Sequence, residues 1–479
     1  MKIALINPPY FEVYKGYEKA AKIGANYPPI GLLYLHARLQ QDGHDVHMFD
    51  AAAENLGPED LLKKVIGFDP GLIGITATTP IFHRTSKIAR TIKDRLNVPI
   101  VVGGIHVTIL PEDSFNGHDE FDYAVLGEGE VTLSELTDCL QKGGDPGSVR
   151  GILYRKNGSV VKTPPRPLAP DLDAFPFPAR DCVDKHNYVW TAPGKGELPV
   201  GSIITKRGCP FFCTFCSQHS MFTRTVRYRS VENILDELEE MVTRQGYEHI
   251  IFLDDTLALK RDRMLQICDG IKNRKLDFTW EAMCRANLVD RELLQAMAGA
   301  GLARISFGIE SGDQDVLDRI KKGITLNQIR MAYKWSKEAG IETRGSAIIG
   351  HPDETRKSAW RTIRFLSSIR HLDQVYINIM VPYPGTLVFD LAKKGEAGYR
   401  LLSDNYSNYI RYNQSVLEVN DLDLKALKRL QNLGLWMFYL KPRRVLYNLK
   451  RAGLRNGIRM AFAMLRGLLS RPATQLNNS

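Results

Sequence analysis

Residues 207–216 read Arg207-Gly-Cys209-Pro-Phe-Phe-Cys213-Thr-Phe-Cys216. Thiolates spaced C-x3-C-x2-C can ligate three irons of a cubane cluster and leave the fourth iron without a protein ligand. That open iron is available to a substrate or cofactor. An electron-transfer cluster needs a fourth cysteine nearby, and none follows in this stretch. The spacing therefore favours a [4Fe-4S] cluster on these cysteines. The alternative is a structural zinc site, for which His219 or Cys284 would be the fourth donor.

On either side of the cysteines the chain alternates strand and helix patterns. Helical periodicity occurs at 231–244, 261–273, 291–300, 326–339 and 355–369. Short apolar runs typical of buried strands occur at 202–205, 249–253, 278–283, 303–307, 343–349 and 375–380. Six strand–helix units predict a partial (β/α)6 TIM-like barrel over residues 201–400, with its chemistry on the loops that follow the strands. The cysteine stretch is the first of these loops.

Residues 1–145 form an earlier alternating series. Strands are expected at 2–7, 45–50, 72–76, 99–103 and 123–126, and helices at 30–42, 59–67, 82–96 and 131–141. This order predicts an α/β domain with a doubly wound, Rossmann-like parallel sheet. Its ligand should lie at the carboxyl ends of the strands. Asn7-Pro-Pro9, Thr76–Thr79, Gly103-Gly104 and Gly127–Glu130 fall at those ends.

The segments outside these two domains have a different character. Residues 146–200 are expected to hold a hairpin that turns at Asn157-Gly158, followed by a stiff, proline-rich linker across the surface. Residues 401–479 are expected to be a basic helical region. It contains amphipathic stretches in which leucines and aromatic residues alternate with arginines. Such helices either lie on anionic membranes or pack on the barrel with one face in solvent. The sequence is compatible with both hypotheses.

The charge is unevenly distributed along the 479 residues. Residues 425–471 hold four lysines and eight arginines without an acidic residue, so the remainder carries −2 of the net +10. A nearly neutral body with a basic tail differs from a uniformly basic protein, and we expect no nucleic-acid partner. The amino terminus is too short in its apolar run for a secretory signal, so we expect a cytoplasmic protein, either free or at the inner face of the membrane.

The cysteine spacing, with aromatic Phe215 just before the last cysteine, resembles that of the radical S-adenosylmethionine (SAM) superfamily. The resemblance extends along the second domain. It implies that the open iron binds the amino and carboxylate groups of SAM. One electron from the cluster, supplied by an external donor such as flavodoxin or ferredoxin, then breaks a carbon–sulfur bond and gives a 5′-deoxyadenosyl radical.

The same resemblance implies further cofactor contacts in chain order. Asp254 and Asp255 fall where the family contacts the cofactor's amino group, although a helix N-cap is the alternative. Arg285, Glu310 and Ser311 resemble the carboxylate and ribose contacts, although a buried ion pair would also explain Arg285 or Glu310. The strand from Gly345 to Gly350 resembles the one that packs against adenine.

Residues 1–145 resemble the cobalamin-binding domain that precedes the barrel in one branch of the superfamily. Thr76, Thr78, Gly103 and Gly104 lie where that fold accommodates the cofactor's nucleotide tail. The Asp-x-His-x-x-Gly signature of other cobalamin proteins is missing, but this branch commonly holds cobalt without a protein histidine. The alternative is a generic doubly wound domain whose glycines serve turns.

The resemblance leaves three hypotheses for function. The first is a cobalamin-dependent radical SAM methyltransferase acting on an unactivated carbon of a small hydrophobic substrate such as a lipid, an isoprenoid or a tetrapyrrole. The second is a ring-forming or oxidative enzyme like the anaerobic magnesium-protoporphyrin monomethyl ester cyclase. The third is a non-catalytic scaffold organised by its metal. Cys284, at the end of a predicted barrel strand, either faces the site or is an inert core residue.

Overall fold

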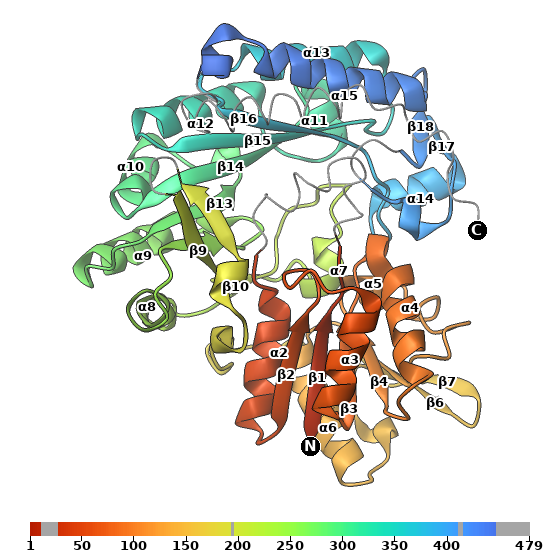
Figure 1. Cartoon of the computed structure of the whole chain (residues 1–479). Helices are drawn as coiled ribbons and strands as arrows, with labels where there is room; N and C mark the ends of the chain where they lie inside the picture. Colours follow the sequence, from red (N-terminus) through yellow and green to blue (C-terminus); the bar gives the residue numbers. More distant parts are fainter. Residues whose placement is uncertain (11–26, 193–195, 411–414, 447–479) are drawn as a thin grey trace.

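Two α/β domains, each built on a seven-stranded sheet, make up most of the molecule (Figure 1). The computed structural model describes residues 1–10, 27–192, 196–410 and 415–446. The first sheet has the order β2-β1-β3-β4-β5-β6-β7 and the second the order β16-β15-β14-β13-β12-β9-β8. The predicted pair of α/β domains is therefore confirmed.

The first sheet is doubly wound. Its parallel strands are β1 (Lys2–Asn7), β2 (Asp45–Asp50), β3 (Leu72–Thr76), β4 (Ile100–Gly103) and β5 (Tyr123–Val125). Its helices are α2 (Ile30–Gln41), α3 (Pro58–Phe68), α4 (Phe82–Lys93), α5 (Ile105–Ile109) and α6 (Gly129–Gln141). Apolar side chains of α2 and α6 pack on one face of the sheet and those of α3 and α4 on the other. The carboxyl ends of its parallel strands therefore form one continuous edge.

The predicted hairpin consists of β6 (Ile152–Lys156) and β7 (Ser159–Lys162), and β6 pairs antiparallel with β5. It belongs to the first sheet, so the first domain extends to Lys162 and the boundary predicted at 145 was too early. The linker after it lies on the surface at residues 164–171, as predicted, but its later part does not. Leu172 and Phe175 are buried against Ile30 and Tyr34 of α2, because apolar residues between the prolines fill the junction of the two domains.

The second sheet is an open half-barrel. The edge strand β8 (Val189–Ala192) is antiparallel to β9 (Gly196–Ile203), and the strands from β9 to β16 are parallel. The other strands are β12 (His249–Phe252), β13 (Thr279–Cys284), β14 (Leu302–Glu310), β15 (Glu342–Ile349) and β16 (Gln374–Ile379). The six predicted barrel strands are confirmed, with the first beginning earlier than expected.

Helices follow the strands of the half-barrel, and the longer ones cover its outer face (Figure 1). They are α8 (Val231–Glu239), α9 (Arg261–Asn273), α10 (Arg291–Gly299), α11 (Gln314–Arg319), α12 (Leu326–Glu338), α13 (Arg356–Ser368) and α14 (Leu387–Lys394). Side-chain caps from Ser230, Asp290 and Thr325 accept backbone N–H groups and fix where α8, α10 and α12 begin. Alternate residues of β15 are buried beneath these helices, and the residues between them face the concave side.

The C-terminal region divides into a packed part and a part outside the described residues. Helix α15 (Leu424–Tyr439) packs on α13 and β16, and Leu427, Leu430 and Phe438 join the barrel core. One side of this helix packs on the barrel, whereas Leu433, Trp436 and Leu440 remain exposed. The strand β18 (Leu417–Val419) lies within the region predicted to be helical, and it pairs with β17 (Tyr399–Leu401) at the boundary of that region. Residues 447–471 of the predicted tail are outside the described residues.

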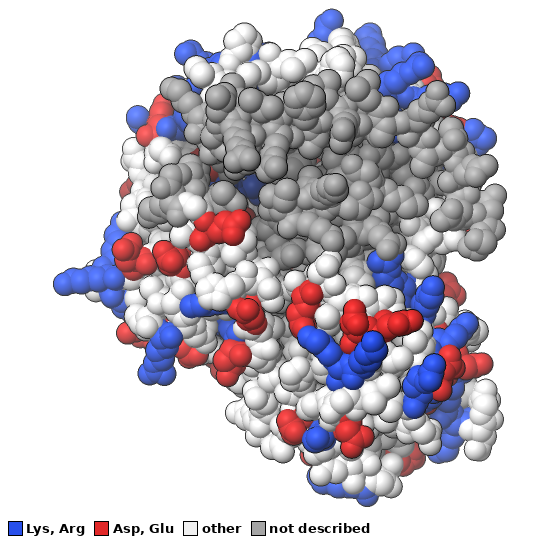
Figure 2. Space-filling model, in the orientation of Figure 1, with Lys and Arg blue, Asp and Glu red and all other residues white. Residues whose placement is uncertain are grey.

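The described chain contains no helix that is both long enough and apolar enough to cross a membrane. On the face seen in Figure 2, lysine and arginine side chains are interspersed with aspartate and glutamate over the first domain. No continuous basic surface is visible on that part of the face, as the nearly neutral composition predicts.

Candidate functional site

The cysteine loop runs from β10 (Lys206–Arg207) to α7 (Gln218–Phe222) and is anchored at both ends. Gly208 has φ +94°, and a Cβ there would overlap the carbonyl oxygen of Thr225, so only glycine fits. In the middle of the loop Thr214 N donates to Ile320 O (3.1 Å) and Thr214 O accepts from Val388 N (3.2 Å). The barrel thus fixes the loop from both sides.

The three thiols lie close enough to interact. All of Cys209, Cys213 and Cys216 are partly exposed. Burial, with the nearby thiols and Asp255, raises the pKa of Cys216 to about 11. No group of three or more His, Cys, Asp or Glu side chains among the described residues converges as the ligands of a single ion do. Thiolates that each bind a different iron of a cubane need not converge in that way, so this donor set fits three corners of a [4Fe-4S] cluster.

Arg285 and two aromatic rings pack around the thiols. The buried Arg285 guanidinium lies 3.6 Å from the centre of the Phe211 ring, and its Nη1 donates to Cys213 Sγ (3.5 Å). Phe215 packs on the barrel core and meets the ring of His351 edge to face at 5.8 Å. Arg285 is therefore next to the cysteine loop, and it has no carboxylate partner among the described residues, which argues against the ion-pair alternative.

Glu310 and Ser311 already have partners within the barrel. Glu310 has φ +61° at the end of β14, and Lys322 Nζ donates to its carboxylate (2.8 Å) in a buried ion pair, as the alternative proposed. The hydroxyl of Ser311 is 2.9 Å from Thr362 Oγ1 and accepts from Asp313 N (3.1 Å). Ser311 therefore holds the turn after β14 against α13. Lys322, the partner of Glu310, has its Nζ 6.0 Å from the centre of the Phe215 ring.

The two aspartates after β12 differ in their surroundings. Asp254 is buried and accepts from both the backbone N–H (3.1 Å) and the hydroxyl (3.0 Å) of Thr205, which ties β12 to the start of the cysteine loop. Asp255 is exposed and acts electrostatically on Cys216. Neither is an N-cap of α9, because its cap residue is Lys260. Of the two, Asp255 has the position from which a bound ligand can be reached.

The glycines of β15 serve two different purposes. A Cβ at Gly345 would lie 2.5 Å from Tyr333 Oη and 2.8 Å from Ile309 Cδ1, so this glycine allows helix α12 to pack closely. Gly350 has φ +92° and ends the strand. Glu354 Oε2 accepts from the backbone N–H groups of Gly350 (2.5 Å) and His351 (3.1 Å), and burial raises the pKa of Glu354 to about 7. Glu354 is a loop-shaping residue that the sequence pattern did not indicate.

The first domain presents its own loops at the carboxyl edge of its sheet. Gly104 has φ +104°, and a Cβ there would lie 2.6 Å from Ala77 O and 3.0 Å from Thr76 Oγ1. Gly103 ends β4, and Thr78 is exposed beside it. These open strand ends fit a large planar ligand that needs close backbone approach. His106 is buried, with its Nδ1 3.3 Å from Thr79 Oγ1 in the loop after β3.

A buried charge cluster joins the two domains, and the sequence pattern did not reveal it. Arg207, two residues before Cys209, binds Glu128 (2.9 Å) and Glu130 (2.5 Å) of the first domain. Arg227 also binds Glu128 (2.7 Å). The Arg207 guanidinium lies 5.4 Å from the centre of the Tyr34 ring. Next to it, α5 packs against α7, so the ligand edge of the first domain lies beside the cysteine loop.

The concave side of the half-barrel carries both apolar and charged side chains, and the charged ones include Glu281, Arg304 and Arg344. Met283 on β13 and Tyr376 on β16 are 48% and 41% exposed, although their strand neighbours are buried in the core. Tyr27, from the first domain, reaches this side and its hydroxyl is 3.4 Å from Glu281 Oε1. The Arg344 guanidinium lies 5.5 Å from the centre of the Tyr376 ring. Cys284 does not face this side. It lies in the core, where burial raises its pKa to about 12.

Comparison with known proteins agrees with this geometry. A model of the radical SAM superfamily matches residues 203–366, and a model of the B12-binding domain matches residues 19–137. An uncharacterized methyltransferase of Pyrococcus horikoshii is 37% identical over 92% of this chain and 93% of its own length. The anaerobic magnesium-protoporphyrin IX monomethyl ester cyclase of Rubrivivax gelatinosus is 30% identical over 76% of this chain and 65% of that protein.

A solved structure shares the whole fold. The radical SAM methyltransferase TsrM from Kitasatospora setae, described with cobalamin and a [4Fe-4S] cluster bound, superposes with a TM-score of 0.72. The two chains are 16% identical, and the match covers 97% of this chain and 98% of that one.

The chain therefore belongs to the radical SAM superfamily. Because a B12-binding domain precedes the half-barrel, it is a cobalamin-dependent radical SAM enzyme, and the relative that is 37% identical is named a methyltransferase.

Proposed function

We propose that this enzyme transfers a methyl group to an unactivated carbon of a small hydrophobic molecule. The exposed side chains of Met283 and Tyr376 carry this proposal, because both lie on the concave side of the half-barrel to which the cysteine loop is attached. Exposed large apolar side chains inside a concave site favour an apolar ligand. The similarity to a cyclase that acts on a tetrapyrrole ester also supports this substrate class.

The proposal gives each part of the chain a role. Cys209, Cys213 and Cys216 hold the cluster, and Arg285, next to Cys213, and Asp255, next to Cys216, contact the bound SAM. Thr76, Thr78, Gly103 and Gly104 hold cobalamin at the carboxyl edge of the first sheet. When bound, the cluster supplies an electron to SAM and cobalamin supplies a methyl carrier. Arg344 and Tyr376 position the substrate, and Tyr27 closes the site from the first domain.

Product analysis tests the proposal. The anaerobic, reconstituted enzyme, reduced by flavodoxin or ferredoxin, should form 5′-deoxyadenosine and S-adenosylhomocysteine in parallel when its substrate is present. Formation of 5′-deoxyadenosine without S-adenosylhomocysteine would instead support ring formation, the second candidate, which the 30% identity to the cyclase favours. Intact SAM after reduction would refute both and leave the scaffold hypothesis.

We also propose that the basic C-terminal region, 425–471, contacts the membrane peripherally. To test this, flotation with anionic vesicles is measured for the full chain and for a chain that ends after Leu446. A chain cut near Asn420 would be a poor control, because removing α15 uncovers Leu427 and Phe438 in the barrel core. The full chain should float with anionic vesicles more than the shortened one. Equal flotation would show that residues 447–479 do not contribute.

A further inference from the structure

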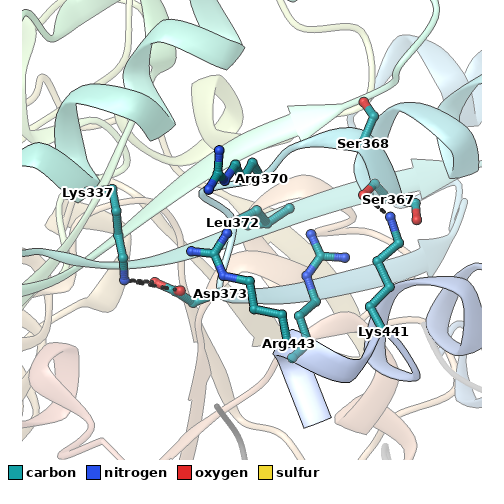
Figure 3. A pocket seen from close by; sticks show the side chains of 9 residues that line it. Lys337, Ser367, Ser368, Arg370, Leu372, Asp373, Lys441 and Arg443 are labelled. Atoms are coloured by element: carbon teal, nitrogen blue, oxygen red, sulfur yellow. Dashed lines mark hydrogen bonds and ion pairs between the residues drawn. The ribbon is translucent and has the colours of Figure 1, made fainter. Parts of the chain in front are cut away.

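A cationic pocket lies at the end of the half-barrel opposite the cysteine loop. It has a volume of about 260 Å³ and is formed by the last turns of α12 and α13, the turn before β16 and the residues that follow α15 (Figure 3). The charged residues that line it are Lys337, Arg370, Asp373, Lys441, Arg443 and Arg444. Five cationic side chains therefore surround a single carboxylate.

Three of the cations serve the local fold. Lys441 Nζ donates to Ser367 O (2.7 Å), and Arg444 Nη2 donates to Ile369 O (2.8 Å), so both bind carbonyl groups at the end of α13. Lys337 pairs with Asp373 (3.4 Å). Basic side chains commonly complement helix C-termini in this way, and these three need no ligand to explain them.

Arg370 and Arg443 have no such explanation. Both are exposed, and neither has a hydrogen bond or an ion pair with any residue in the described part of the chain. In Figure 3 they come from opposite walls of the pocket, Arg370 from the turn before β16 and Arg443 from the segment after α15. Burial, together with Arg370, Arg443 and Lys337, lowers the pKa of His371. The two arginines therefore act on one region, where an anion with several oxygens would be favourably placed.

An apolar stripe leads to this pocket along the outer face of α15. Leu433, Trp436 and Leu440 are 41%, 42% and 66% exposed, and their spacing of three and four residues places them on one side of the helix. The opposite side of the same helix is buried in the barrel core. Large apolar side chains in a row beside guanidinium groups are typical of surfaces that lie in the interface of an anionic bilayer, where tryptophan is favoured.

We propose that this pocket binds the phosphate of an anionic phospholipid headgroup, with Leu433, Trp436 and Leu440 seated in the membrane interface beside it. The inference rests on the proposed membrane contact and gives it a specific site within the described residues. The six residues of β16 alone span about 20 Å, so the pocket is far from the cysteine loop. It anchors the enzyme and does not receive the substrate or the electron donor.

Vesicle partition of the full chain tests this site without any assay of methyl transfer. The vesicles contain phosphatidylglycerol in phosphatidylcholine, and the test variant is Arg370→Gln/Arg443→Gln. Each basic residue near such a surface contributes about 1 kcal/mol, so the double variant should partition about thirty-fold less. The matched control is Lys87→Gln/Arg95→Gln, which removes the same charge from exposed positions of the first domain. It should partition like the unaltered chain.

A second measurement tests whether the apolar stripe enters the bilayer. Lipids brominated on their acyl chains should quench the tryptophan fluorescence of the full chain, and Trp436→Phe should remove most of that quenching. Equal loss of partition in both charge variants would indicate a general charge effect and refute lipid binding by the pocket. Unchanged partition of Arg370→Gln/Arg443→Gln would refute lipid binding by the pocket directly. Quenching that persists in Trp436→Phe would refute the placement of the apolar stripe in the membrane interface. Failure of these tests leaves the methyl-transfer assay unaffected, and the reverse also holds.

Discussion

Removal of the Arg207 guanidinium should destabilise the junction between the two domains and the cysteine loop together. In Arg207→Met, Glu128 keeps Arg227 as a partner but Glu130 loses its ion-pair partner while remaining buried. Removing one partner of a buried ion pair lowers the free energy of unfolding by about 3–5 kcal/mol. Glu130→Gln removes the stranded charge, so the double variant should recover part of this loss, with a coupling energy of about 1–3 kcal/mol.

The five tryptophans of the chain all lie at or after residue 190, so their fluorescence follows the barrel during urea unfolding of the apoprotein. Lys162→Met, which breaks the exposed pair of Lys162 with Glu112, is the matched control and should cost less than about 1 kcal/mol. Arg207→Met should also lose reconstituted iron faster than this control. A coupling energy below about 0.5 kcal/mol between positions 207 and 130 would show that the ion pair does not hold the junction.

Three further predictions concern the sites themselves. Cys213→Ala should abolish SAM cleavage and lower the bound iron, because one corner of the cubane loses its ligand, whereas Cys268→Ala in the core of α9 should retain the iron; iron analysis decides. Gly104→Ala should abolish cobalamin binding, measured by absorbance, because its Cβ would overlap Ala77 O; retained cobalamin would refute the placement. The raised pKa of Glu354, about 7, means that the folded protein favours the protonated carboxyl, so the free energy of unfolding should fall by about 3 kcal/mol as pH rises from about 4.5 to 7. Glu354→Gln should flatten that dependence in urea titrations, and an unchanged slope would assign it to other groups.

Strands and helices with strong periodicity were predictable from the sequence. The strand at 2–7 and the helix at 261–273 were predicted with their observed bounds, because a buried run or an amphipathic stripe determines each locally. The cysteine loop was predictable as well, since its chemistry depends on spacing within ten residues.

The features that escaped prediction depend on contacts between distant parts of the chain. Arg207 meets Glu128 and Glu130 across about eighty residues, and Tyr27 reaches Glu281 from another domain. Periodicity carries no information on such pairs. The same limit explains why the proline-rich linker was placed on the surface, although Leu172 and Phe175 are buried in the domain junction.

Mössbauer spectroscopy of the anaerobic protein reconstituted with ⁵⁷Fe tests the central claim most directly. If three cysteines leave one iron open, addition of SAM should change the signal of one iron in four and leave the other three as they were. A cluster whose four irons do not respond to SAM, or a protein that retains no cubane at all, would contradict the proposed chemistry.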